Sequence, residues 1–194
     1  MQPLGERVNV DSGLAELRQH LIAIAAVVVV AVVAWRAIAA RRRKGLQEHF
    51  GSEYDRTVAD APSRREAESE LAERQKRRDE LEIRPLEPQA RDRYASEWHN
   101  TQARFVDDPE AAVGDADRLI QQVMRDRGYP VEDFDQRSAD LSVDHPEVIS
   151  NYRAAHGISI ANERGNASTE NLLTAMVHYR ALFEELLESE PARS

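Results

Sequence analysis

Three histidines in the C-terminal half are the side chains best suited to metal binding or proton transfer. His145, His156 and His178 fall in segments with helical periodicity, and acidic residues are plentiful around them. A helical domain could bring some of them together, since imidazole and carboxylate groups bind divalent metals. Helical di-iron proteins, however, carry Glu-x-x-His pairs, and the sequence has none. We therefore interpret these histidines as hydrogen-bonded structural residues, with His145 before a proline at a helix start, and predict no metal or cofactor.

The local motifs of common enzyme classes are also missing from the sequence. There is no His-Glu-x-x-His, Walker loop, Gly-x-Ser-x-Gly elbow or Gly-x-Gly-x-x-Gly turn. There is no cysteine, which excludes disulfides, thiolate metal sites and cysteine nucleophiles. We accordingly expect a protein that is not an enzyme.

Most aromatic side chains recur at helical spacing, which is typical of a packed core. In the alternative interpretation, a few of them, such as Trp98 and Tyr152, line a groove for a partner helix or a small ligand. The candidate groove or core residues are Tyr94, Trp98, Phe105, Tyr152, Tyr179 and Phe183.

Three arginines lie near these aromatics on helix edges: Arg104, Arg153 and Arg180. We expect them to pair with the abundant carboxylates. A more specific hypothesis is a buried Arg–Asp pair that fixes helix register, with Asp107 and Asp144 as candidates.

The charge of the 194-residue chain is unevenly distributed. Residues 36–44 carry five positive charges and no negative ones, whereas residues 45–194 contain 19 Lys and Arg against 32 Asp and Glu. Phosphate backbones repel so acidic a segment, so we predict no nucleic-acid partner.

One segment near the N-terminus predicts a membrane-spanning helix. Leu21 to Trp35 are fifteen consecutive apolar residues, which as a helix cover about 22 Å of a hydrocarbon core of about 30 Å. Continuing to Ala40 gives a sufficient length, with Arg36 near the end, where its side chain can reach the headgroups. Trp35 suits an interfacial anchor. We place the transmembrane helix at residues 19–40, in contact with the lipid bilayer.

The distribution of charge around this segment also predicts its orientation. A buried core helix and a cleaved signal peptide are the alternatives, but signal peptides carry positive charge before the apolar stretch. Here the basic residues Arg41, Arg42, Arg43 and Lys44 follow it. Because positive residues stay in the cytosol, we predict a single-pass protein of the cytoplasmic membrane with its N-terminus outside. The basic tract could also bind anionic lipid, although a stop-transfer signal explains it more simply.

The remaining sequence predicts helices separated by clear boundary signals. Leu46, Phe50, Tyr54 and Val58 recur every fourth residue and predict one helix that tolerates Gly51. The signals that follow include a capping box at Ser63–Glu66, prolines at 85 and 88, an Asp108-Pro109 helix start, a helix end at Gly128, a capping box at Asp144–Glu147, and a cap at Ser168 or Thr169.

The densely charged helix over residues 64–82 could be a solvated stalk or a coiled-coil arm capable of self-association.

The predicted fold class is all-α, with a transmembrane helix, a juxtamembrane helical arm and a soluble helical bundle. The predicted divisions are an extracytoplasmic tail (1–18), the transmembrane helix (19–40), a basic tract and charged arm (41–84), the bundle (85–188) and a C-terminal tail (189–194).

Five phrases of the sequence resemble an uncharacterised family of bacterial, mainly actinobacterial, membrane or secreted proteins. They are Glu53-Tyr54-Asp55-Arg56, Ile83-Arg84-Pro85-Leu86, Arg104-Phe105-Val106-Asp107, Arg127-Gly128-Tyr129-Pro130 and His145-Pro146 with Asn151-Tyr152-Arg153. The resemblance covers nearly everything from Leu46 to Leu187. It implies a shared fold and a bacterial source, but no activity and no catalytic residue.

The leading functional hypothesis is a membrane-anchored, non-enzymatic interaction or regulatory domain with another protein as partner. The alternatives are a membrane-tethered helical sensor of a small molecule or metal, and the same domain outside the membrane as an envelope protein.

Overall fold

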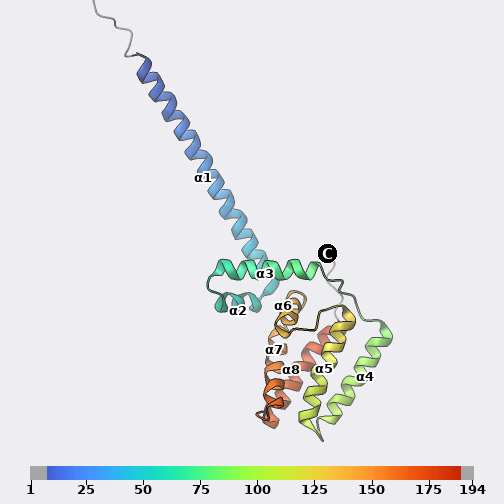
Figure 1. Ribbon diagram of the computed structural model, residues 1–194. Coiled ribbons are helices and arrows are strands. Elements are labelled where there is room, and N and C mark those ends of the chain that lie inside the picture. The colour runs from blue at the N-terminus through green and yellow to red at the C-terminus, as the bar shows by residue number, and fades with distance from the viewer. Residues whose placement is uncertain (1–7, 189–194) are drawn as a thin grey trace, which may run out of the picture. The chain divides into compact units, whose positions relative to one another are not determined.

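The computed structural model describes residues 8–188, and every regular element in that range is an α-helix. The side chains of residues 8–17, 22 and 23 lie outside the description, as do residues 1–7 and 189–194 entirely. The helices are α1 (Val8–Phe50), α2 (Ser52–Asp60), α3 (Arg64–Asp79), α4 (Pro88–Arg104), α5 (Pro109–Arg127), α6 (Phe134–Asp144), α7 (Ile149–Glu163) and α8 (Thr169–Glu188) (Figure 1). The all-α fold class is confirmed for the described residues.

The chain divides into two compact units, Met1–Gly45 and Leu46–Ser194. The arm predicted for residues 41–84 therefore lies partly in the same unit as the helices that follow it. Of the two predicted tails, residues 189–194 lie outside the description, whereas residues 8–18 belong to α1.

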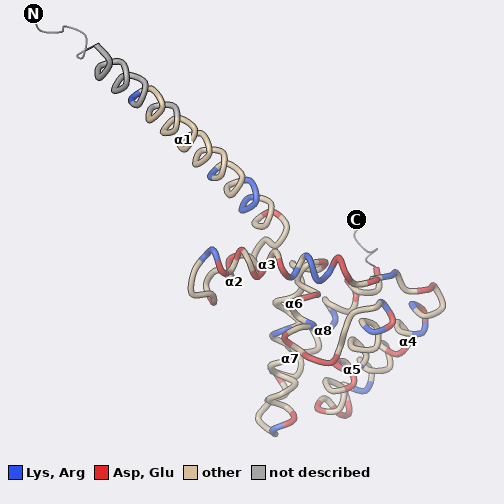
Figure 2. The backbone as a smooth tube through the Cα atoms, turned by 45° about the horizontal axis from the view of Figure 1, so that its top comes forward, with Lys and Arg blue, Asp and Glu red and all other residues tan. Residues whose placement is uncertain are grey.

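The first unit contains most of α1, whose apolar side chains are exposed. Val27, Val30 and Trp35 are each more than two-thirds exposed, and Figure 2 shows this uncharged stretch giving way to the basic residues near the end of the helix. Burial in a protein core therefore does not account for the apolar run. By length and composition, the segment Arg18–Phe50 is able to cross a membrane.

Helix α1 extends into the second unit and ends just before Gly51. The prediction of a continuous helix through Gly51 is wrong, because α1 ends at Phe50 and Gly51 adopts φ 49° before α2 starts. Glycine has no Cβ and tolerates positive φ at little cost. Phe50 and Tyr54 still share one apolar cluster, in which they meet Leu71 of α3 and Val143 of α6.

Helix α3 is capped as predicted but is not a free stalk. The Ser63 side chain accepts a hydrogen bond from the Glu66 N–H, and the Glu66 carboxylate accepts one from the Ser63 hydroxyl. The helix packs against α2 and α6, with Arg74 and Arg78 only 6% and 7% exposed. Its apolar residues Ala67 and Leu71 are also buried, and self-association through residues 64–82 stays a prediction.

The main hydrophobic core lies among α4, α5, α7 and α8, which pack against one another in pairs. Asp108 caps α5 by accepting from the Ala111 N–H, and Pro109 occupies its first turn, as predicted. The same helix ends at Gly128, with φ 98°. A Cβ at that position would overlap the carbonyl oxygen of Glu82, so both the backbone conformation and the close approach require glycine.

The predicted capping box at Asp144–Glu147 is wrong. Asp144 is the last residue of α6, and α7 begins five residues later, at Ile149, without a side-chain cap. The Asp144 carboxylate instead accepts hydrogen bonds from Arg78 and Tyr129. His145 therefore follows a helix end and does not begin a new helix. At the start of α8, Ser168 supplies the cap.

Candidate functional site

A surface cleft of about 460 Å³ lies where residues of α2, α3, α6 and α7 come together. We call it the arginine cleft, because four of its lining residues are arginines. The lining consists of Arg56, Glu70, Arg74, Arg77, Asp133, Phe134, Asp135, Gln136, Ser138, Ala139 and Arg153. The volume is in the range of small-molecule sites.

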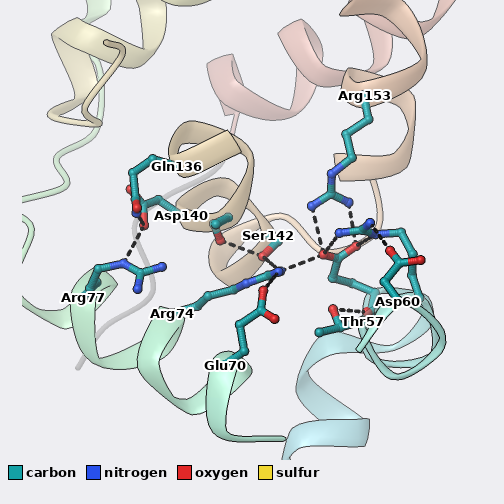
Figure 3. A network of polar contacts seen from close by, with 12 residues as sticks. Thr57, Asp60, Glu70, Arg74, Arg77, Gln136, Asp140, Ser142 and Arg153 are labelled. Atoms are coloured by element: carbon teal, nitrogen blue, oxygen red, sulfur yellow. Dashed lines mark hydrogen bonds and ion pairs between the residues drawn. The ribbon is translucent and has the colours of Figure 1, made fainter. Parts of the chain in front are cut away.

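Three of these arginines converge on one carboxylate, that of Glu53. Arg153 donates through Nη1 and Nη2 at 2.7 and 2.9 Å, and Arg56 donates through Nε and Nη2 at 2.9 and 3.0 Å. Arg74 adds a bond through Nη1 at 2.8 Å. Figure 3 shows Arg153 reaching this centre from one side and Arg74 from another. Since the Glu53 side chain is 1% exposed, this is a buried ion cluster.

Local sequence rules account for part of the cluster. Glu53 lies in the first turn of α2, where a negative charge is favourable. Arg56 follows at i+3 on the same face and also pairs with Asp60 at i+4. Arg74 and Arg153 come from α3 and α7, so the rest of the cluster depends on tertiary packing.

Arg74 is the most buried arginine of the cleft. Its Nη1 also donates to the Ser142 hydroxyl at 3.3 Å, and its Nη2 pairs with Glu70. Its Nε has no hydrogen-bond partner among the described residues. One turn later, the Nε of Arg77 is 3.7 Å from the carboxylate of Asp140, which also accepts from the Gln136 side chain at 2.8 Å.

The arginines dominate the electrostatics around Glu53. Burial by itself raises the pKa of this carboxyl, but the hydrogen bonds from Arg56, Arg153 and Arg74 together lower it to about 2. Glu53 is therefore ionised at neutral pH. Its three arginine partners all line the cleft, whereas Glu53 does not, so the carboxylate holds the cleft arginines without lining the cleft itself.

A second buried polar network joins the end of α6 to α3 and α8. Arg78 Nε lies 2.7 Å from both oxygens of Asp144, and the Tyr129 hydroxyl donates to the same carboxylate at 2.5 Å. His145 is 4% exposed, with Nδ1 3.0 Å from Glu185 and Nε2 3.4 Å from the Tyr129 hydroxyl. Burial lowers the pKa of His145, although Glu185 acts in the opposite direction.

The other two histidines are placed separately. His156 stacks on Phe134 with ring centroids 3.7 Å apart, and its Nδ1 is 3.7 Å from Asp117. His178 is half-buried on α8. Among the described residues, no group of three histidine or acidic side chains has the arrangement of a metal site.

The predicted aromatic residues lie in or against the main core. Trp98 and Phe183 stack with centroids 4.7 Å apart, and the Tyr179 hydroxyl donates to Asp117 at 2.8 Å. The Tyr94 hydroxyl donates to Asp126, Tyr152 is fully buried, and Phe105 is partly buried against the same cluster. The predicted interface residues Trp35, Arg36, Arg41, Arg42, Arg43 and Lys44 all lie on α1.

Sequence reasoning found only some of the cleft residues. The hypothesis of a buried Arg–Asp pair includes Arg153 among its arginines and Asp144 among its aspartates. In the structure Arg153 pairs with Glu53, and Asp144 pairs with Arg78. Arg104 and Arg180 form exposed pairs with acidic residues. Glu53 and Arg74 were missed as site residues, and only the i, i+3 spacing of Glu53 and Arg56 gave a local signal.

Comparisons with protein-family models, with curated proteins and with solved structures find no match for this chain. The resemblance to an uncharacterised bacterial family stays a prediction.

Proposed function

We propose that this chain is a membrane-anchored, non-enzymatic interaction protein of a bacterial cell membrane. The observation that carries the proposal is α1, whose apolar segment is long enough to span a bilayer and whose described apolar side chains are exposed. In water such a helix would leave a large apolar surface uncovered, whereas in lipid that surface is solvated and every helical backbone bond is retained. The helical unit that follows is the part that meets partners, and we infer that its helices form a bundle.

The proposed orientation places the N-terminus outside and the acidic helical unit in the cytosol. It is supported by the basic residues Arg41–Lys44, which directly follow the apolar segment. The acidic unit is repelled by anionic headgroups, and the basic tract is the part that faces them.

Reporter fusions at the C-terminus test the anchor and its orientation together. A reporter that is active only in the cytosol should be active, and the full chain should stay in the membrane fraction after alkaline carbonate washing. Activity of a reporter that works only after export would instead favour the envelope protein. Release of the full chain by carbonate would refute the anchor itself.

The interaction role is tested by affinity purification of the full chain from membranes in mild detergent. We expect the same protein partner to be recovered under several growth conditions, and to be lost when a control protein carrying α1 alone is the bait. If no partner is enriched over that control, the interaction role is refuted.

A second candidate function is a membrane-tethered small-molecule sensor. The observation that favours it is the arginine cleft, which has the volume of a ligand site and polar walls. Screening metabolites for thermal stabilisation of the full chain in detergent tests it.

A further inference from the structure

The arginine cleft also carries an inference that rests on the second candidate function, the sensor, and that names its class of ligand. Arg153 holds Glu53 with two N–H bonds, one to each carboxylate oxygen, and Arg56 does the same. Two-point contacts of this kind fix the plane of a guanidinium group as well as its position. Glu53 therefore positions the arginines and keeps them fixed where they line the cleft.

Several polar groups of this wall lack hydrogen-bond partners among the described residues. They are the Nε of Arg74, the Nε of Arg77 and the hydroxyl of Ser138. Arg74 and Ser138 are 6% and 2% exposed, and buried polar groups are nearly always hydrogen-bonded. These three atoms are themselves buried. Because arginine nitrogens only donate, the exposed part of Arg77 requires a ligand group with acceptor oxygens.

The charges around the cleft limit what that group can be. Glu70 already pairs with Arg74, and Asp133 caps the N-terminus of α6. Arg77 is the least compensated cation, since its carboxylate neighbour Asp140 is 3.7 Å away and its side chain is 42% exposed. Asp135, also in the lining, is exposed. Glu53 and the three acidic residues of the lining already match the four cleft arginines in number, so a chain of many negative charges would be repelled. The hydrogen-bond donors that remain on Arg77 suit one small anion.

We propose that the arginine cleft binds one oxyanion group, a carboxylate or a phosphate, which contacts Arg74 and Arg77, with Glu53 as the positioning residue. Guanidinium groups suit both anions because their N–H geometry matches a pair of anionic oxygens. The site is independent of the membrane anchor, so the orientation of α1 does not affect it.

The test is calorimetric titration of the full chain in uncharged detergent at neutral pH and constant ionic strength. The probes are inorganic phosphate and acetate, with chloride as the control for screening. We expect saturable binding of phosphate, of acetate or of both, and none of chloride. Binding of phosphate alone identifies the group as a phosphate, and binding of acetate shows that a carboxylate suffices. Absence of saturable binding by both probes overturns the proposal.

Variants of the exposed Arg77 locate the site without disturbing the buried cluster. Arg77→Gln should weaken binding about tenfold or more, the effect of losing a charged hydrogen bond. Arg77→Lys, which keeps the charge, should lose less. Arg118→Gln is the matched control, since this exposed arginine of α5 lies outside the cleft, and its affinity should equal that of the unmodified chain. Equal affinity of Arg77→Gln and the unmodified chain would place the bound anion elsewhere and overturn the assignment.

Discussion

Glu53 illustrates how one buried charge can depend on both local and distant residues. Its carboxylate accepts hydrogen bonds from Arg56, Arg74 and Arg153, which come from three helices. Taking charges out of water is unfavourable, so a buried ion cluster adds little net stability compared with an apolar core. Removing one member is costly, because the remaining charges stay buried without compensation.

Glu53→Gln should therefore destabilise the helical unit by about 3–5 kcal/mol, the usual effect of breaking a buried pair. Glu184→Gln is the control, since the Glu184–Arg180 pair is exposed and should contribute about 0.5 kcal/mol or less. Urea denaturation of both variants in detergent, followed by circular dichroism, measures the difference. Similar free energies of unfolding for the two variants would show that the loss of Glu53 does not leave uncompensated buried charges.

The Glu53 carboxyl should also make the stability of the folded protein depend on pH. Its pKa is lowered from 4.5 to about 2 in the folded protein, so the folded state binds the proton less readily than the unfolded state. The resulting stabilisation, on the order of 3 kcal/mol, is complete above about pH 4.5 and is lost as the pH falls towards 2. Between pH 6 and 2.5, the free energy of unfolding should fall more with decreasing pH for the unmodified chain than for Glu53→Gln. Denaturation curves recorded at each pH measure it, and an equal pH dependence in the two proteins would contradict the assignment.

For individual residues, the sequence predicted the type of interaction better than the partner residue. Arg153 and Asp144 both take part in ion pairs, as the hypothesis of a buried Arg–Asp pair expects. Their partners, Glu53 and Arg78, are not residues that the hypothesis named. Helical spacing identifies neighbours within one turn, such as Glu53 and Arg56. It carries no information about which side chain of another helix will approach.

Among the helices, boundaries with a local chemical cause were predictable. The caps at Ser63 and Asp108 and the left-handed end at Gly128 all occur where the sequence indicated them. The failures have local causes too. Gly51 ends α1 because its positive φ is compatible with a sharp turn, and Asp144 is drawn away from a capping role by Arg78 and Tyr129.

Two glycines should respond oppositely to substitution by alanine. Gly128→Ala should destabilise the helical unit by about 1–3 kcal/mol, since its φ of 98° is strained for alanine and the added Cβ meets the backbone of Glu82. Gly157→Ala lies within α7, where nothing is within 4 Å of the new Cβ. It should stabilise by about 0.5–1 kcal/mol, because alanine favours the helix. Thermal denaturation of both variants measures the contrast, and a stabilising Gly128→Ala would be inconsistent with the turn described.

For the whole molecule, apolar periodicity predicted an all-helical chain, and the described residues are all-helical. The packing of α3 against α6 was not predicted, because the contacts involve arginines that a charge-rich sequence marks as solvent-facing. The arginine cleft depends on that packing, so it could not be foreseen either.

The basic tract provides a test of the proposed anchor at this scale. Replacing Arg41, Arg42, Arg43 and Lys44 with glutamine leaves the apolar segment intact but removes the charges that favour cytosolic retention. We expect some molecules to insert in the reverse orientation, detected as activity of an export-dependent reporter at the C-terminus. The control replaces Arg64 and Arg65, further along the chain, and should leave the orientation unchanged. An unaltered reporter pattern in the first variant would show that the tract does not set the orientation.

The distance in sequence between Glu53 and Arg153, 100 residues, has a consequence for folding kinetics. Contacts that close so long a loop cost much chain entropy and tend to form after the rate-limiting step. The Glu53 cluster should then be largely absent from the folding transition state, so that Glu53→Gln accelerates unfolding far more than it slows folding. Stopped-flow unfolding and refolding of the full chain in detergent would separate the two rates, and equal changes in both would indicate earlier formation of the cluster. If unfolding carries the change, this carboxylate chiefly determines how long the folded state lasts once it has formed.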